Sequence, residues 1–101
     1  MSKGYWIVRA DIADQEKYNE YMKANAEPFK KFGAKFLVRA GRFLTVEGVS
    51  RARNVVIEFP SYQIALDCWN SPEYQRAIKL RQPASTLDLV IIEGFDGYLV
   101  V

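Results

Sequence analysis

Four segments of the chain show the spacing of apolar side chains that is typical of β-strands, and they are rich in β-branched and aromatic residues. They span residues 4–11, 35–47, 53–59 and 86–93. Gly41 interrupts the second segment, either as the turn of a tight hairpin or as a bulge in one long strand. We favour the bulge, because Ala-Gly is a weak two-residue turn and an isolated glycine in a strand pattern often marks a bulge. Residues 48–52 then predict the turn into the third strand.

Two stretches with helical periodicity lie between these strands. In residues 15–32, apolar side chains recur every three or four positions, and Asp14 precedes them as an N-cap. Pro28 predicts a kink or break in this stretch, because proline lacks the backbone N–H that a helix interior uses. Residues 62–81 form a second stretch, in which Ser71 caps a new helical piece. The order βαββαβ predicts one α+β domain with four strands.

The predicted strands carry apolar side chains on both faces. In the third strand, Val55, Ile57 and Phe59 point away from Val56, and the last strand has the same two-sided pattern. A sheet that helices cover on one side should be polar on its other side when that side faces water. Burial of apolar surface stabilises by roughly 25 cal/mol per Å². We therefore expect a homodimer that pairs through the sheet face, with a monomer as the alternative.

The composition is that of an ordinary globular domain. The chain has 101 residues, of which 50% are apolar and 26% are charged, enough for one hydrophobic core and too few for two domains. Residues 1–53 carry 11 basic and 6 acidic side chains, a net charge of +5, and residues 54–101 carry 3 basic and 6 acidic, a net charge of −3. The basic half favours an anionic ligand. Because the chain has no dense Lys/Arg tract, we expect no nucleic-acid partner.

The chain lacks the residues that several kinds of catalysis and metal binding require. The chain has no histidine and one cysteine, Cys68, which excludes Ser–His and Cys–His catalysis, zinc sites built on histidine or cysteine, and an intrachain disulfide. We expect no metal, no cofactor and a buried structural Cys68. No apolar run is long enough for a membrane helix and no signal peptide is visible, so the expectation is a cytoplasmic protein without a membrane partner.

Arginines inside predicted strands and helices are the candidate ligand-binding residues, because buried charges need a partner or a ligand. Arg39 lies in the second strand, where alternation places it on the face opposite Phe36, and Arg81 ends an apolar helical face that includes Tyr74. We expect Arg39 and Arg81 to bind an anionic group in a pocket between helices and sheet, with Tyr74 donating a hydrogen bond or stacking. Arg9, in the first strand, is a further ligand-binding candidate. The alternative is exposure at a sheet edge or structural ion pairing.

Two carboxylates are candidates for catalysis. Asp11 and Glu93 each lie in a predicted strand, and either one would act as a general base if burial raised its pKa. The residues do not indicate which reaction is catalysed, or that one is.

Several segments, taken together, resemble one family. They are GYW at residues 4–6, FLVRAGR at 36–42, VIEFPS at 56–61, SPEYQ at 71–75 with LR at 80–81, and VIIEG at 90–94. The family is a domain-of-unknown-function family, number 1330, within the dimeric α+β barrel superfamily. The resemblance implies a ferredoxin-like fold with a four-stranded antiparallel sheet, and a homodimer whose two sheets form a barrel. It implies no activity.

Three functions stay open. The first is a protein that binds or transforms a small anionic metabolite, the second is a regulatory or structural dimer without a ligand, and the third is an RNA-binding module. RNA-recognition modules share the element order, but residues 53–59 lack their Lys/Arg-Gly-aromatic pattern. We place the barrel domain at residues 1–95 and a C-terminal tail at residues 96–101.

Overall fold

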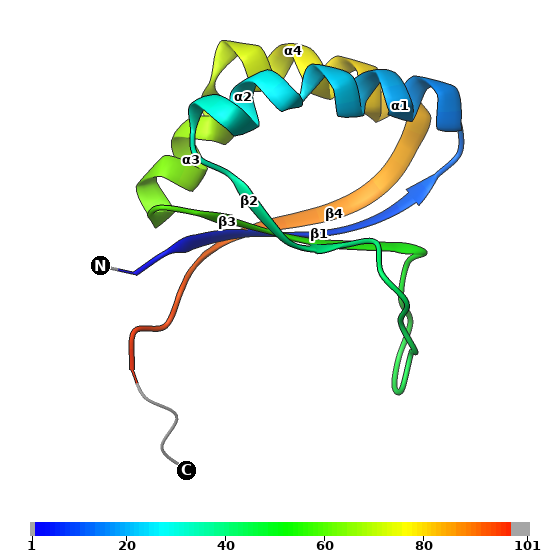
Figure 1. The fold of residues 1–101 in the computed structure, drawn as a ribbon. Coiled ribbons are helices and arrows are strands. Elements are labelled where there is room, and N and C mark those ends of the chain that lie inside the picture. Colours follow the sequence, from blue (N-terminus) through cyan, green and yellow to red (C-terminus); the bar gives the residue numbers. More distant parts are fainter. Residues whose placement is uncertain (1, 98–101) are drawn as a thin grey trace.

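The computed structural model describes residues 2–97 as a four-stranded sheet with its helices on one face (Figure 1). The elements are β1 (Gly4–Ile12), α1 (Gln15–Ala24), α2 (Ala26–Lys31), β2 (Lys35–Arg39), β3 (Arg53–Phe59), α3 (Tyr62–Asn70), α4 (Pro72–Arg81), a 3-10 turn (Gln82–Ala84) and β4 (Ser85–Glu93). The strand order is β2-β3-β1-β4, and every neighbouring pair is antiparallel. The predicted ferredoxin-like α+β fold is confirmed.

Local signals in the helices act as predicted. α1 ends at Ala24 and α2 begins at Ala26, so the helix breaks just before Pro28, which lies in the first turn of α2 where its missing N–H is harmless. Oδ1 of Asp14 accepts a hydrogen bond from the N–H of Lys17, and Oγ of Ser71 accepts one from the N–H of Tyr74. These caps satisfy backbone donors that the helices leave unpaired.

The prediction of one long strand over residues 35–47, with a bulge at Gly41, is wrong. β2 ends at Arg39, because Ala40 adopts φ = +56° and turns the chain out of the sheet. Residues 40–52, which we call the arm, project from the sheet on the side away from the helices (Figure 1). The arm has the composition of a strand, but among the described residues no neighbouring strand pairs with it.

A β-bulge inside β2 decides which way Arg39 points. Phe36 pairs with Ile57 and Arg39 pairs with Val55, with a shift of register between the two pairs. Ile57 and Val55 are buried on the helix-covered face, so Phe36 and Arg39 both point to that face. The predicted placement of Arg39 opposite Phe36 is therefore wrong, because alternation fails across the extra residue.

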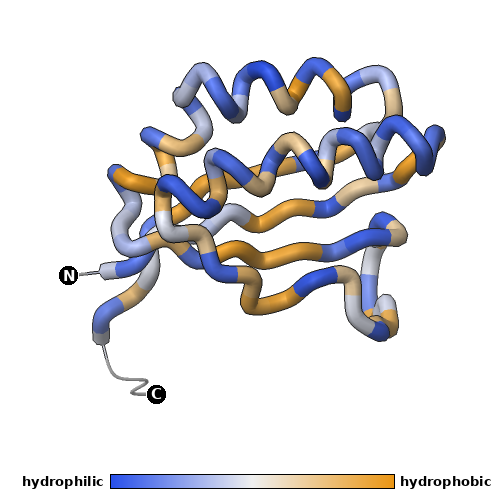
Figure 2. Tube along the Cα trace, turned by 45° about the horizontal axis from the view of Figure 1, so that its top comes forward, coloured by the Kyte–Doolittle hydropathy of each residue, from blue (hydrophilic) through white to orange (hydrophobic). Residues whose placement is uncertain are grey.

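The core fills the space between the helices and the inner face of the sheet, where hydrophobic residues follow the strands (Figure 2). Trp6 lies at its centre, fully buried, and its indole N–H donates to the carbonyl of Ala65. The Trp6 ring lies 4.9 to 5.9 Å, centre to centre, from the rings of Phe29, Phe59, Trp69 and Tyr74. Such pairs add to the stabilisation that burial supplies.

The outer face of the sheet, which no helix covers, carries an apolar row. Strand pairing aligns Val38, Val56, Ile7 and Val90 across all four strands. Ile7, Val38 and Val90 are 41%, 45% and 42% exposed. The rows on either side are mixed: one holds Asn54, Arg9 and Asp88, and the other holds Lys35, Glu58, Tyr5 and Ile92. The prediction that both faces of the sheet carry apolar side chains is confirmed.

Some expectations concern the ends of the chain and membranes. The boundary expected at residue 95 stays a prediction, and residues 98–101 of the expected tail lie outside the described residues. No helix within residues 2–97 has the length and apolar character that a membrane span requires.

Candidate functional site

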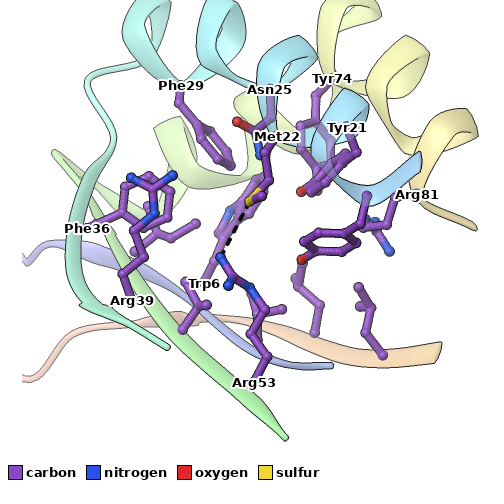
Figure 3. A pocket seen from close by; sticks show the side chains of 16 residues that line it. Trp6, Tyr21, Met22, Asn25, Phe29, Phe36, Arg39, Arg53, Tyr74 and Arg81 are labelled. Carbon is purple, nitrogen blue, oxygen red and sulfur yellow. Dashed lines mark hydrogen bonds between the residues drawn. The ribbon is translucent and has the colours of Figure 1, made fainter. Parts of the chain in front are cut away.

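A cavity lies between the inner face of the sheet and helices α1, α2 and α4 (Figure 3). Apolar side chains of the sheet, among them Val8, Val55 and Leu89, form its floor. About 400 Å³ in and around it is free of atoms, but only about 30 Å³ admits the centre of a water molecule. One water needs about 10–15 Å³ by that measure. The inner part is therefore narrow and suits a group as small as a carboxylate.

Three arginines reach this cavity from three different elements. Arg39 ends β2, Arg53 begins β3 and Arg81 ends α4. Arg81 is only 5% exposed, Arg53 is half-buried, and Arg39 is exposed at the mouth. No acidic side chain lines the cavity, and within residues 2–97 none of the three arginines forms an ion pair. The cavity therefore carries three positive charges without a counter-charge.

Each of the three guanidinium groups packs against an aromatic ring instead of pairing with a carboxylate. The guanidinium carbon lies 4.3 Å from the ring centre of Phe36 for Arg39, 5.5 Å from that of Tyr18 for Arg53, and 5.4 Å from that of Tyr21 for Arg81. A cation–π contact attracts the cation without using its N–H donors. The Nε atoms of Arg53 and Arg81 are buried and have no hydrogen-bond partner among the described residues. Nη2 of Arg53 donates to Sδ of Met22 at 3.7 Å (Figure 3). The Nε–H groups of Arg53 and Arg81 are therefore the donors available to an anion.

Two tyrosine hydroxyls meet beside Arg81 (Figure 3). The Oη atoms of Tyr21 and Tyr74 lie 2.8 Å apart in a buried hydrogen bond, which leaves one of the two hydroxyl protons free to donate elsewhere. Burial raises the pKa of Tyr74 far above its usual value, and it also raises the pKa of Tyr18. At neutral pH the hydroxyls of Tyr74 and Tyr18 therefore stay protonated and act as donors.

The lining defines what chemistry the cavity supports. Guanidinium and hydroxyl donors bind anions and stabilise a developing oxyanion. Among the described residues, the lining includes no Asp, Glu, His, Lys or Cys that would accept a proton. Binding and charge stabilisation are therefore within its reach, whereas proton abstraction would need a base from the ligand or from solvent.

The structure brings together three of the sequence-predicted residues. Arg39, Tyr74 and Arg81 line the same cavity, and their role in ligand binding stays a prediction. Arg9 does not join them, because it lies on the outer face, where its Nη2 donates to the carbonyl oxygen of Val49 in the arm at 2.7 Å.

The two candidate bases also lie away from the cavity. Asp11 is on the outer face, where it accepts hydrogen bonds from the N–H of Ala52 at 3.0 Å and from Nη1 of Arg51 at 2.7 Å. These two hydrogen bonds lower the pKa of Asp11, which is the opposite of what a general base needs. Glu93 is exposed at the end of β4. The structure gives neither carboxylate a place at the cavity.

Three further residues line the cavity that were not among the predicted site residues. Arg53 lies two residues before Val55 in a strand without a bulge, so alternation would have placed it on the inner face. Tyr18 and Tyr21 belong to the apolar stripe of α1 and are buried, but that pattern does not reveal that their rings support arginines.

Cys68 is fully buried, as predicted, and burial raises the pKa of its thiol to about 12. It therefore lacks the thiolate character of a reactive cysteine. The described residues form no cluster of three metal-ligating His, Cys, Asp or Glu side chains, and the expectation of no metal and no cofactor stays a prediction.

The family model of a domain of unknown function (DUF1330) matches residues 3–95. The chain belongs to this family. The match spans every helix and strand of the DUF1330 fold described above, from β1 to β4, and it confirms the resemblance that the sequence segments indicate. Membership in DUF1330 carries no activity with it, so the function of the cavity must be argued from its residues. No curated protein matches the chain.

Solved structures share the fold at low sequence identity. A protein of unknown function from Rhodopseudomonas palustris is 17% identical, with a TM-score of 0.76 over 95% of this chain and 85% of that chain. SnoaB, a cofactor-independent oxygenase from Streptomyces nogalater, is 11% identical, with a TM-score of 0.63 over 100% and 98%. A dimeric ferredoxin-like protein of unknown function from Thermobifida fusca is 12% identical, with a TM-score of 0.61 over 91% of each chain. At these identities the likeness is one of fold alone.

Proposed function

We propose that this DUF1330 chain is a homodimeric protein that binds a small anionic metabolite in the arginine-lined cavity. One observation carries the proposal: Arg81 is only 5% exposed, its buried Nε is unpartnered among the described residues, and no acidic side chain of residues 2–97 lines the cavity around it. Burial of an unpaired charge is strongly unfavourable. A buried arginine without an acidic partner is therefore explained by a ligand that supplies the negative charge.

The surroundings of Arg81 select the kind of ligand. A guanidinium group presents parallel N–H donors that match the two oxygens of a carboxylate, and the Tyr21–Tyr74 pair offers a hydroxyl donor beside it. The narrow inner space fits a planar carboxylate head, while the exposed Arg39 lies where the rest of a ligand would emerge. These features support a small organic anion as the ligand.

The alternatives receive less support. A purely structural dimer would not need an unpaired buried arginine, although a regulatory dimer that senses the ligand without transforming it fits the same geometry. An RNA-recognition surface displays aromatic side chains of its first and third strands to solvent. Here Trp6 of β1 and Phe59 of β3 are fully buried under the helices.

The first test measures anion binding through Arg81. A carboxylate from a panel of acetate, succinate, benzoate and longer organic acids is expected to raise the Tm of the wild-type protein, because a ligand that binds only the folded state stabilises it. The Arg81→Met variant is expected to lose about 10- to 100-fold in affinity, which corresponds to one hydrogen bond to a charged group. Thermal shift gives the first reading, and isothermal titration calorimetry gives the affinity.

Two further variants make this test specific. Arg76 lies on the same helix as Arg81 but is exposed, so Arg76→Met is the matched control and should bind as the wild type does. Arg39→Met, at an exposed position, is expected to weaken binding without perturbing the core. If no anion shifts the Tm, or if the shift persists in Arg81→Met, the cavity is not an anion site.

The dimer in this proposal is supported by the outer face. The apolar row of Ile7, Val38, Val56 and Val90 crosses the whole sheet and is flanked by rows that each hold both charge signs. A two-fold axis through such a face places apolar on apolar and leaves opposite charges free to pair. The Thermobifida fusca protein of the same fold is described as dimeric.

The arm adds to the argument for a second copy. Its side chains Leu44, Val46 and Val49 are 82%, 87% and 90% exposed, although all three are apolar. The base of the arm is fixed to the outer face by the hydrogen bonds from Arg9 to Val49 and from Ala52 to Asp11. A partner docked on the outer face would lie beside this arm and cover its apolar side chains.

The oligomeric state tests this part directly. Wild-type protein at micromolar concentration is expected to have twice the chain mass of 11.6 kDa in light scattering or sedimentation. Ile92→Lys places a charge on the outer face and should shift the mass toward 11.6 kDa, because an unpaired charge opposes burial at an interface. Leu80→Lys, at a similarly exposed position on α4, should leave the dimer intact. A wild-type monomer would refute the dimer.

A further inference from the structure

We propose that the ligand of this cavity carries two separate anionic groups, and that it is a small dicarboxylate. The inference rests on the proposed anion binding and adds the number and placement of the ligand's charges. One carboxylate binds Arg81 at the inner end, and the other binds Arg53 toward the mouth, where Arg39 is exposed.

Two unpartnered nitrogens, on two different elements, are the first reason. Nε of Arg81 belongs to α4 and Nε of Arg53 belongs to β3, and both are buried without a hydrogen-bond partner among residues 2–97. A carboxylate that binds one guanidinium through two parallel hydrogen bonds uses both of its oxygens. A second acceptor group would let Arg53 form the same pair of parallel hydrogen bonds on its own element.

The positions of the arginines are the second reason. Figure 3 shows Arg39 and Arg81 on opposite sides of the cavity, with Arg53 at a third position below it. The Arg81 guanidinium is held on the ring of Tyr21 and that of Arg53 on the ring of Tyr18, so each is tied to its own place. A ligand with two anionic groups would bind the guanidinium groups of Arg81 and Arg53 while each stays on its own ring.

The net charge of the cavity also favours a ligand with two negative charges. The three arginines have no acidic partner among the described residues. A monoanion would leave two unbalanced positive charges in a partly buried space, and a dianion leaves one, on the side where Arg39 meets solvent. Water screens that exposed charge far better than it screens a buried one.

The lining between the charged positions is apolar. Arg39 is aligned with Val55, Val8 and Leu89 across the sheet, and Arg53 is aligned with Ala10 and Leu87. A methylene or otherwise apolar linker matches this floor, whereas a polar linker would lose hydrogen bonds to water there. Two carboxylates joined by a short apolar linker therefore satisfy the charges and the floor together.

The test compares acids that differ only in the second carboxylate. Succinate is titrated against butyrate, glutarate against pentanoate and adipate against hexanoate, by calorimetry at neutral pH and constant ionic strength, with inorganic phosphate as a further arm. At the best chain length we expect the dicarboxylate to bind at least about 10-fold more tightly than its monocarboxylate, as a second charge-assisted hydrogen-bonded group implies.

Variants assign the two carboxylates to their arginines. Arg53→Met is expected to bring the affinity for the dicarboxylate down to that for the monocarboxylate, while the affinity for the monocarboxylate changes less than about 3-fold. Arg81→Met should weaken both acids together, and the exposed control Arg76→Met should weaken neither.

The outcomes separate this inference from the proposed function. If monocarboxylates bind through Arg81 as tightly as dicarboxylates of every length, the two-group inference is overturned and anion binding stands. If phosphate binds more tightly than every dicarboxylate, a single doubly charged group occupies the site, and the inference is likewise overturned. If no arm of the series binds, both proposals fail.

Discussion

Trp6→Ala is expected to lower the free energy of unfolding by about 3–5 kcal/mol, the range for removal of a large buried aromatic side chain. Trp6 is fully buried, contacts four other aromatic rings, and satisfies its indole N–H with the carbonyl of Ala65. Its removal leaves a void below the helices that those rings are too rigid to fill. Urea unfolding followed by circular dichroism measures the loss.

The chain supplies its own matched control for this substitution. Trp69 on α3 is partly exposed, and its ring pairs with the rings of Trp6 and Tyr74, so Trp69→Ala removes the same side chain from a less buried site. We expect it to lower the free energy of unfolding by well under the value for Trp6→Ala. A larger loss for Trp69→Ala would show that the core is not centred on Trp6.

Arg81→Met is expected to raise the free energy of unfolding of the ligand-free protein, by about 1–3 kcal/mol. Exchange of buried ionic groups for apolar side chains of similar volume is often stabilising by amounts of this size. Arg81 is 5% exposed, and its guanidinium has no acidic partner among the described residues. Methionine keeps much of the stem that packs beside Tyr21 and removes that charge. The measurement is equilibrium unfolding in dialysed, anion-poor buffer.

The sign of this change distinguishes two roles for Arg81. An arginine retained for ligand binding destabilises the free protein, so its loss raises stability while it weakens binding. An arginine that holds the structure together would show the reverse sign, and a fall in the free energy of unfolding would contradict our prediction. Arg76→Met, exposed on the same helix, should change stability by less than about 0.5 kcal/mol.

Local rules predict most of this fold, because most of its elements obey them. The caps Asp14 and Ser71 and the break before Pro28 involve neighbours in the sequence, and they lie where the pattern places them. The prediction for the second strand fails because residues 40–47 have the composition of a strand, but no described strand pairs with them. Only the three-dimensional structure shows that Ala40 turns the chain away from β3.

The candidate site, too, is only partly predictable from the sequence, because the direction of single side chains depends on details such as a bulge. Arg81 and Tyr74 follow helical spacing, so their shared face is visible in the sequence. Arg39 shares the cavity only because a bulge shifts the alternation of β2, and one extra residue in a strand leaves no clear mark in the pattern. Asp11 was a plausible base from its strand position, but its ion pair with Arg51 joins segments 40 residues apart.

The bulge in β2 also bears on how the protein avoids aggregation. β2 is an edge strand of the sheet, and edge strands with regular unpaired backbone groups invite strands of other molecules to add to them. A bulge breaks that regular spacing, and the charged Lys35 and Arg39 at the ends of β2 discourage close approach of another strand. The irregularity that turns Arg39 into the cavity thus also protects this edge from open-ended growth.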